Sequence, residues 1–289
     1  MLYPTSQPVA AYGQYTLPLP SANLSYWAVP EKLQMRLGLA QTMARPNLSA
    51  MAPTSTNNAI NGTPQLNYNG TAGLRPIKAL QADASVEWYY QPHAALAGAL
   101  FGKRIRDDIY QASQTNVDLG TIIYSGQPGA TGTTSAPFPW TVTAPANGSR
   151  SLFYGIELTW QHFLENGFGV HVQYTHTQSK GWDQTGAFVG AINAVPPTTM
   201  SIGLIYDKGP LSADINWDHA SNYTYYCSQC TEVPGWPAIS DAFAWVTASA
   251  HYKITKELKV YVEGRNLTDA VARTYLNGNP LLPLSLIHI

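Results

Sequence analysis

The feature that most constrains this chain is a strict alternation of apolar with polar or small residues, repeated in many separate segments. In one segment, Leu33, Met35, Leu37 and Leu39 alternate with Gln34, Arg36, Gly38 and Ala40. Successive side chains of a β-strand point to opposite faces, so each such segment predicts a strand with one apolar and one polar face. The pattern recurs at residues 82–90, 156–161, 170–175, 200–206, 213–218, 246–252 and 258–263. Residues 95–105 also indicate a strand, but their pattern leaves its outward face open.

The breaks between these segments alternate regularly between short and long. Short connections fall at residues 29–32, 91–93, 164–167, 207–210 and 253–257. Long polar connections fall at about 46–76, 111–150, 179–197 and 221–241, and from 268 onward. Transmembrane barrels have short periplasmic turns and long extracellular loops, whereas long structureless loops are uncommon in compact soluble domains. The spacing therefore predicts an antiparallel up-and-down sheet whose two ends face different environments.

Segment length and composition agree with a membrane-spanning β-barrel. The segments run roughly nine to twelve residues, against the 9–11 that a tilted strand needs to cross a bilayer. Charged residues make up 11% of the chain, well below the roughly 25% of soluble domains. Many tyrosines and tryptophans stand near segment ends, as amphipathic rings do at membrane boundaries. A soluble β-sandwich with aromatic core residues is the alternative, although its strands are usually nearer five or six residues.

Four stretches resemble the C-terminal barrel half of TonB-dependent outer-membrane receptors. They are LPSANLSYWAVPEKLQMRLGLAQTMARPNL at 19–48, GLRPIKALQADASVEWYY at 73–90, LFGKRIRDDI at 100–109 and VEGRNLTDAVARTY at 262–275. They stand in the order that the family has and cover most of the chain. Within that family, the chain is most similar to the subfamily linked to oligosaccharide uptake.

The resemblance implies an all-β, antiparallel, up-and-down transmembrane barrel of twenty-two strands, of which about ten lie here. It assigns residues 1–283 to a partial receptor barrel, while 284–289 (LSLIHI) look like a non-native tail translated from a sequencing adaptor. No basic start followed by an apolar stretch opens the chain, so the leader, the plug domain and the TonB-contacting motif are expected upstream. After residue 283 the family would continue with a loop and a final strand.

The function implied by the resemblance is active uptake of a scarce nutrient, an oligosaccharide or a ferric siderophore, across the outer membrane of a Gram-negative bacterium. The expected partners are outer-membrane lipid and lipopolysaccharide, the substrate, and the TonB–ExbB–ExbD complex through the missing N-terminal region. Two alternatives remain: a passive outer-membrane porin and a secreted carbohydrate-binding β-protein. The net charge of -1 gives no reason to expect a nucleic-acid partner.

Two sets of residues are candidates for contact with plug or substrate. The polar stripes are expected to face a wet lumen, where they hydrate the wall or bind the plug; they include Asp83, Glu87, Glu157, Gln161, His171, Gln173, Asp214, Asn216, Asp218 and Glu263. Aromatic and acidic residues in the long connections suit a sugar ring or a siderophore, or else pack the loops together. These ligand-binding candidates are Trp140, Trp182, Asp183, Tyr223, Tyr225, Tyr226 and Trp236.

Catalytic and metal motifs receive no support from the sequence. No GxSxG, P-loop, GxGxxG or HExxH stretch occurs, so neither an enzyme nor a cofactor is predicted. Cys227 and Cys230 form a CxxC pair that we interpret as a disulfide holding one exported loop. The alternatives are a redox motif or half a metal site, for which His219 is the only close further ligand.

Overall fold

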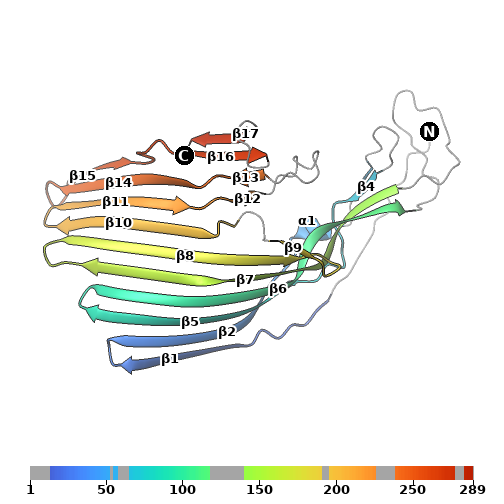
Figure 1. Ribbon diagram of the computed structural model, residues 1–289, viewed down its shortest axis with the longest axis horizontal. Coiled ribbons are helices and arrows are strands. Elements are labelled where there is room, and N and C mark those ends of the chain that lie inside the picture. The colour runs from blue at the N-terminus through green and yellow to red at the C-terminus, as the bar shows by residue number, and fades with distance from the viewer. Residues whose placement is uncertain are drawn as a thin grey trace.

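The computed structural model describes residues 14–52, 55–57, 65–117, 140–190, 195–225, 238–276 and 283–288. Ten strands follow one another side by side in one antiparallel path (Figure 1). They are β1 (Ser21–Val29), β2 (Leu33–Ala44), β5 (Ile77–Gln91), β6 (Ala94–Val117), β7 (Trp140–Phe163), β8 (Phe168–Trp182), β10 (Thr198–Lys208), β11 (Leu211–Ala220), β14 (Phe243–Lys253) and β15 (Lys259–Gly264). The up-and-down order predicted from the sequence is confirmed.

The strand register gathers the apolar stripes on one face of the sheet, called here the outer face. Leu37 lies opposite Leu24 and Ala84, and the same row continues through Leu100 to Ile156. The other face, called here the inner face, carries the polar stripes. Thr159 lies opposite Gln173, Gln173 opposite Ser201 and Ser201 opposite Asp218. All the polar residues that the sequence predicts for the lumen share this inner face.

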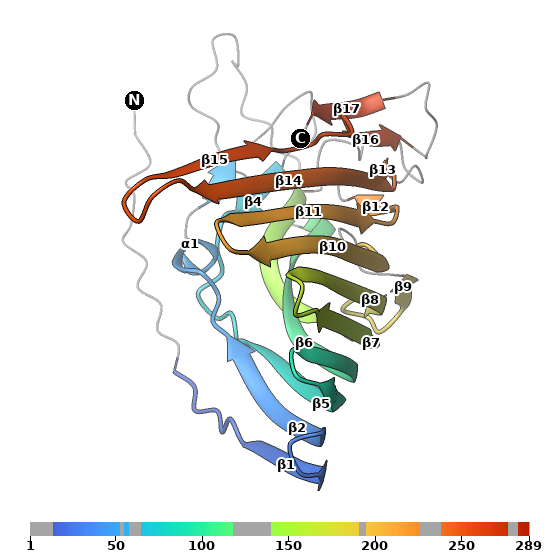
Figure 2. The same ribbon diagram turned by 90° about the vertical axis from the view of Figure 1, so that its left-hand side faces the viewer.

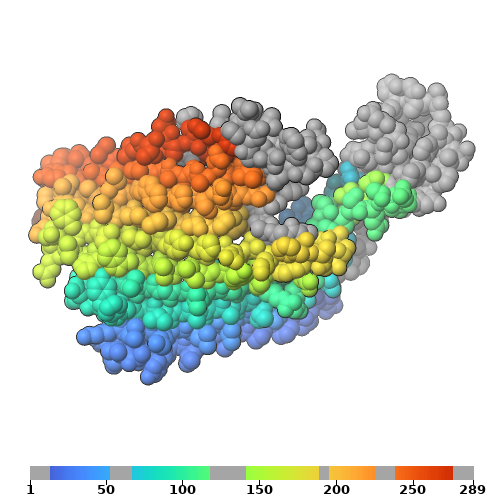
Figure 3. Space-filling view, viewed as in Figure 1, coloured from blue at the N-terminus to red at the C-terminus, as the bar shows by residue number. Residues whose placement is uncertain are grey.

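The large apolar side chains of the outer face are exposed. Leu37 is 47% exposed, Leu100 61%, Leu204 56% and Val262 67%. In Figure 3 the strands themselves form the visible face, and no further layer of described residues lies across them. A water-soluble sheet buries its apolar face against another layer. An apolar stripe left open along ten strands therefore fits contact with lipid rather than with a protein core.

The two ends of the sheet differ as the sequence predicts. Five tight hairpins at one end join β1 to β2, β5 to β6, β7 to β8, β10 to β11 and β14 to β15. The left-handed backbone of their turns falls at Glu31 (φ 58°), His93 (φ 64°), Gly167 (φ 98°) and Gly209 (φ 63°). The long connections, all at the opposite end, hold the remaining elements. These include α1 (Leu48–Met51), β3 (Ser55–Asn57), β4 (Gln65–Tyr68) and β9 (Phe188–Gly190). A separate four-stranded sheet is formed by β12 (Tyr223–Tyr225), β13 (Ala238–Ser240), β16 (Val271–Leu276) and β17 (Pro283–His288).

The β6–β7 hairpin is longer than the sequence indicates. Each strand has 24 residues, so at about 3.3 Å per residue each measures roughly 80 Å, far more than the hydrocarbon thickness. Residues 111–117 and 140–150, predicted as part of a polar connection, continue the two strands instead. Backbone pairing needs no apolar alternation once the strands have left the membrane, so the pattern stops before the strands do.

Viewed from the hairpin end, the sheet curves as an open trough with β1 and β15 at its two margins (Figure 2). Within the described ranges these margins do not pair with each other, so the barrel is not closed. Among these residues there is also no helix long and apolar enough to cross a membrane. Residues 283–288 pair with β16 as β17; their assignment to a non-native tail from position 284 stays a prediction.

Candidate functional site: the inner face and the loop end

A hydrogen-bonded network lines the inner face beside the first hairpin. Arg36 Nη2 lies 3.3 Å from Glu87 Oε2, and the Tyr89 hydroxyl donates to the same carboxylate at 2.5 Å. Arg36 also donates to Gln34 Oε1 at 2.8 Å, and Gln34 Nε2 donates to Ser25 Oγ at 2.8 Å. Charged hydrogen bonds of this kind fix side chains in place. This part of the wall is therefore an ordered polar surface.

A second polar array crosses four strands near the centre of the inner face. The His171 ring of β8 lies over Gly203 of β10, where an added Cβ would stand 2.0 Å from His171 Cε1 and 2.3 Å from Asn216 Oδ1. Asn216 Nδ2 donates to Asp214 Oδ2 at 3.0 Å, and Ser249 Oγ donates to Asp214 Oδ1. A glycine at position 203 is required because any side chain there would displace the imidazole. The array presents imidazole, amide and carboxylate groups to the lumen.

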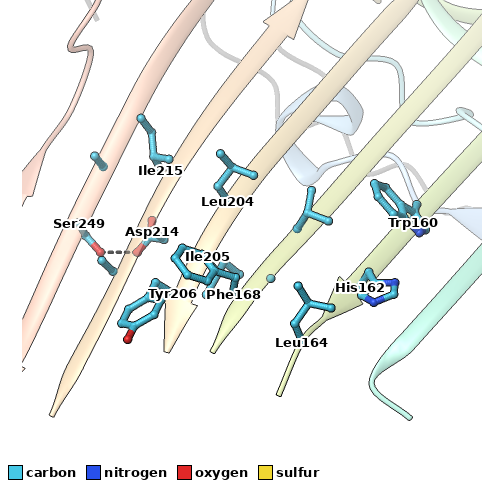
Figure 4. Close-up of a pocket in the computed structure, with 14 residues that line it drawn as sticks. Trp160, His162, Leu164, Phe168, Leu204, Ile205, Tyr206, Asp214, Ile215 and Ser249 are labelled. Atoms are coloured by element: carbon cyan, nitrogen blue, oxygen red, sulfur yellow. Dashed lines mark hydrogen bonds between the residues drawn. The ribbon is translucent and has the colours of Figure 1, made fainter. Parts of the chain in front are cut away.

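An apolar groove lies on the sheet near the short hairpins (Figure 4). Its volume is about 760 Å³, and most of its lining belongs to the outer face, including Phe168, Leu204, Tyr206 and Ile215. At its rim, Trp160 Nε1 donates to the Tyr90 hydroxyl at 2.8 Å, and that hydroxyl is hydrogen-bonded to His162 Nδ1 at 2.8 Å. Such aromatic groups are typical of a lipid–water boundary. The groove suits a lipid chain and lies far along the strands from the predicted ligand-binding loops.

Trp182 stands at the loop end of β8 with two neighbours that the sequence does not single out. The Arg150 guanidinium lies 5.3 Å from its ring centroid, and the Phe188 ring packs against its edge at 5.9 Å. A guanidinium over an indole face is an attractive cation–π contact. Trp182 is half-buried between them. Because it lies opposite Arg150 in the register, it belongs to the outer face of the sheet.

The side chain of Asp183 stabilises the turn that follows it. Its Oδ1 accepts hydrogen bonds from the Thr185 hydroxyl at 2.7 Å, and from the backbone N–H groups of Thr185 and Ala187 at 2.9 Å each. The Thr185 hydroxyl, followed by these backbone donors, holds the pKa of Asp183 below its ordinary value. Asp183 therefore keeps the loop after Trp182 in shape, and its role in ligand binding stays a prediction.

The other predicted ligand residues do not gather around Trp182 in the described structure. Trp140 begins β7, about 33 Å along that strand from Arg150, which faces Trp182, at about 3.3 Å per residue. Tyr223 and Tyr225 lie in β12, where they pair with Ser240 and Ala238 of β13. Tyr226 and Trp236 lie outside the described residues, as do Cys227 and Cys230, so their disulfide stays a prediction. In the described part of the chain no three His, Cys, Asp or Glu side chains are grouped to hold a metal ion.

Asn147 connects three segments at the loop end. Its Nδ2 donates to the backbone carbonyls of Arg75 at 2.9 Å and Asp107 at 2.8 Å, and its Oδ1 accepts from Arg75 N–H at 2.7 Å. Asp107 in turn binds the side chains of Arg75 at 2.8 Å and Lys78 at 3.1 Å. One amide thus ties the segment before β5 to β6 and β7. Sequence reasoning missed it because an isolated Asn in a polar stretch carries no periodic signal.

We expect Asn147→Ala to loosen the loop end, because three backbone groups lose their partner. At about 1 kcal/mol for each net hydrogen bond, the free energy that stabilises the loop end should fall by about 1–3 kcal/mol. Protease digestion of the intact receptor should detect it as faster cleavage between residues 69 and 76. Lys208→Ala, an exposed position at the hairpin end of the sheet, is the control and should leave this cleavage unchanged; equal cleavage rates in Asn147→Ala and wild type would contradict the role of Asn147.

The sheet has an exposed apolar outer face and a polar inner face, with short turns at one end and long connections at the other. These features define the wall of a membrane-spanning β-barrel. More specifically, the chain belongs to the TonB-dependent receptor family: the family model described as "TonB dependent receptor-like, beta-barrel" matches residues 4–267. The resemblance seen in the four sequence stretches is thereby confirmed. No curated protein sequence matches the chain.

Solved structures share the fold. The siderophore receptor PirA from Acinetobacter baumannii is similar with a TM-score of 0.68 at 16% identity, over 87% of this chain and 37% of that one. A mutant of the ferric enterobactin receptor PfeA from Pseudomonas aeruginosa is similar with a TM-score of 0.65 at 16% identity, over 88% of this chain and 35% of that one. The copper transporter OprC is similar with a TM-score of 0.56 at 14% identity, over 88% of this chain and 34% of that one. The chain thus spans about a third of the length of these proteins.

Proposed function

We propose that this chain is the later part of the barrel of an outer-membrane receptor that takes up a scarce nutrient by active transport energised through TonB. The observation that carries the proposal is the ten-stranded wall with its exposed apolar outer face and ordered polar inner face, in a chain of the TonB-dependent receptor family. In the complete receptor, the inner face surrounds the plug and the loop end faces the outside of the cell.

Two substrate classes are open under this proposal. A ferric siderophore is supported by fold neighbours that are themselves siderophore receptors. An oligosaccharide is supported by the sequence stretches that resemble the oligosaccharide-uptake subfamily. Substrate identity depends on the long connections, which vary far more than the strands they join.

The rival functions differ from this proposal in ways that can be observed. A passive porin would share the two-faced wall but would need neither a plug nor TonB. A secreted carbohydrate-binding protein would need its apolar stripes covered, yet Leu100 and Val262 are among the most open large side chains on the sheet. That exposure favours a membrane protein over a secreted one.

The experiment is an uptake assay in the source bacterium with the intact gene, a deletion of it, and a strain without functional TonB. We expect the deletion to abolish uptake of one labelled ferric siderophore or one oligosaccharide, and the loss of TonB to abolish it equally. Complementation with the intact gene is the control. Uptake that persists without TonB would refute active transport and favour the porin.

A further inference from the structure

A patch of cations lies on the outer face at the loop end of β5, β6, β7 and β8. Its members stand in two neighbouring rows of the register. In the first row, Lys78 lies opposite Arg106, and Arg106 opposite Arg150. In the second row, Arg104 lies between Leu80 and Leu152, and Leu152 lies opposite Lys180. The term basic patch is used below for Lys78, Arg104, Arg106, Arg150 and Lys180.

The basic patch begins where the apolar band of the outer face ends. Two residues further along β5 and β6 the same face carries Ala82 and Gly102, and the next row brings together Leu100 and Ile156. Arg104, Arg106, Arg150 and Lys180 are exposed, and Lys78 is half-buried. The patch is therefore at the boundary between hydrocarbon and water, on the side of the long connections.

Little of this positive charge is neutralised by the protein. Asp107 pairs with Lys78 at 3.1 Å, and it also pairs with Arg75. Arg150 and Lys180 lie over the rings of Trp182 and Tyr154, at 5.3 and 5.7 Å, and these contacts orient the cations without cancelling their charge. Within the described part of the chain, no carboxylate forms an ion pair with Arg104 or Arg106.

The two arginines also border a hollow. A depression of about 160 Å³ is lined by Gln41, Lys78, Leu80, Arg104 and Arg106, among others. Guanidinium groups bind phosphate with two parallel hydrogen bonds, and like charges held side by side favour an anion between them. A hollow lined both by cations and by the apolar Leu80 matches an amphipathic anion rather than a small soluble one.

We propose that the basic patch binds the phosphate groups of a phosphorylated lipid in the outer leaflet, whose acyl chains run down the outer face over Leu80, Leu100 and Ile156. This proposal rests on the proposed function only for the orientation of the barrel in the membrane. Bound lipid would hold β5 to β8 together from outside. It is a binding site separate from that of the transported nutrient.

The test uses the full-length receptor in detergent and measures the Kd for diphosphorylated lipid A by native mass spectrometry. For Arg104→Gln/Arg106→Gln we expect binding weaker by about tenfold to a hundredfold, because two charge-assisted contacts are lost. Lys208→Gln, at the hairpin end of the outer face, is the matched control and should stay within about twofold of wild type. Fully dephosphorylated lipid A should bind wild type and the double variant equally weakly.

Three outcomes would overturn the assignment: an unchanged Kd in the double variant, equal binding of dephosphorylated lipid, or full competition by millimolar inorganic phosphate. Because Arg104 and Arg106 are exposed, the double variant should fold, and a heat-modifiable shift on gel electrophoresis verifies this. Arg104→Lys gives a second measure, with an intermediate Kd expected because the charge remains without the bidentate geometry. An unchanged Kd for lipid A in the double variant, together with normal TonB-dependent uptake, would reject the basic patch while leaving the proposed function intact.

Discussion

Replacing Leu158 with arginine should prevent stable insertion of the receptor into the outer membrane. Leu158 lies in the apolar band of β7 on the outer face, between Ile156 and Trp160. It is 47% exposed and lies opposite Gly98 and Tyr174. An arginine on the lipid face of a barrel costs about 2–4 kcal/mol near the bilayer midplane. That cost is a large part of a typical folding free energy of about 5–15 kcal/mol. The amount of heat-modifiable receptor in outer-membrane fractions measures the effect.

The matched control is Gln173→Arg. Gln173 is on β8, opposite Thr159, so it is diagonally adjacent to Leu158 but on the inner face. The side chain is exposed and already polar, so an arginine there stays hydrated and the expected change in insertion is under about 1 kcal/mol. Equal loss of both variants would mean that the two faces are not distinguished by lipid, and the barrel assignment would fail.

Alternation alone was enough to predict most of the wall. Residues such as Leu37 and Asp214 belong to segments where every second side chain is apolar, and the register places them on the predicted faces. Residues 95–105 could not be resolved in this way, because alanine and glycine occupy both stripes. The structure puts Leu96 and Leu100 on the outer face, and Phe101 on the inner face, where its ring packs at Gly155. The neighbouring strands, and not the local sequence, decide that orientation.

The loop end was much less predictable. The extension of β6 to Val117 depends on pairing with β7, for which the polar residues of that stretch give no periodic signal. The role of Asn147 depends on two segments that are 72 and 40 residues away in the chain. The basic patch is likewise invisible in sequence, since Lys78, Arg106 and Arg150 meet only through strand register. Long-range pairing fixes these features, whereas alternation reports only local environment.

Residues 1–289 expressed alone should neither insert into a bilayer nor remain soluble as a monomer. The path of the sheet ends at β1 and β15, and each outermost strand presents a row of backbone groups to its surroundings. In hydrocarbon each unpaired N–H or C=O costs several kcal/mol. In water, the same open margins, next to exposed side chains such as Leu24 and Val262, pair with other copies of the chain. Refolding into detergent or liposomes, followed by size-exclusion chromatography, should therefore yield aggregates.

The full-length receptor, refolded under the same conditions, is the control, because the strands that precede β1 and follow β15 would close the barrel. It should give a heat-modifiable, protease-protected band that the isolated chain lacks. A monodisperse monomer of residues 1–289 in buffer without detergent would show that the apolar stripe can be covered within this chain. That result would remove the physical basis for assigning the outer face to lipid, since the exposure of residues such as Leu100 is what separates a barrel wall from a soluble sheet.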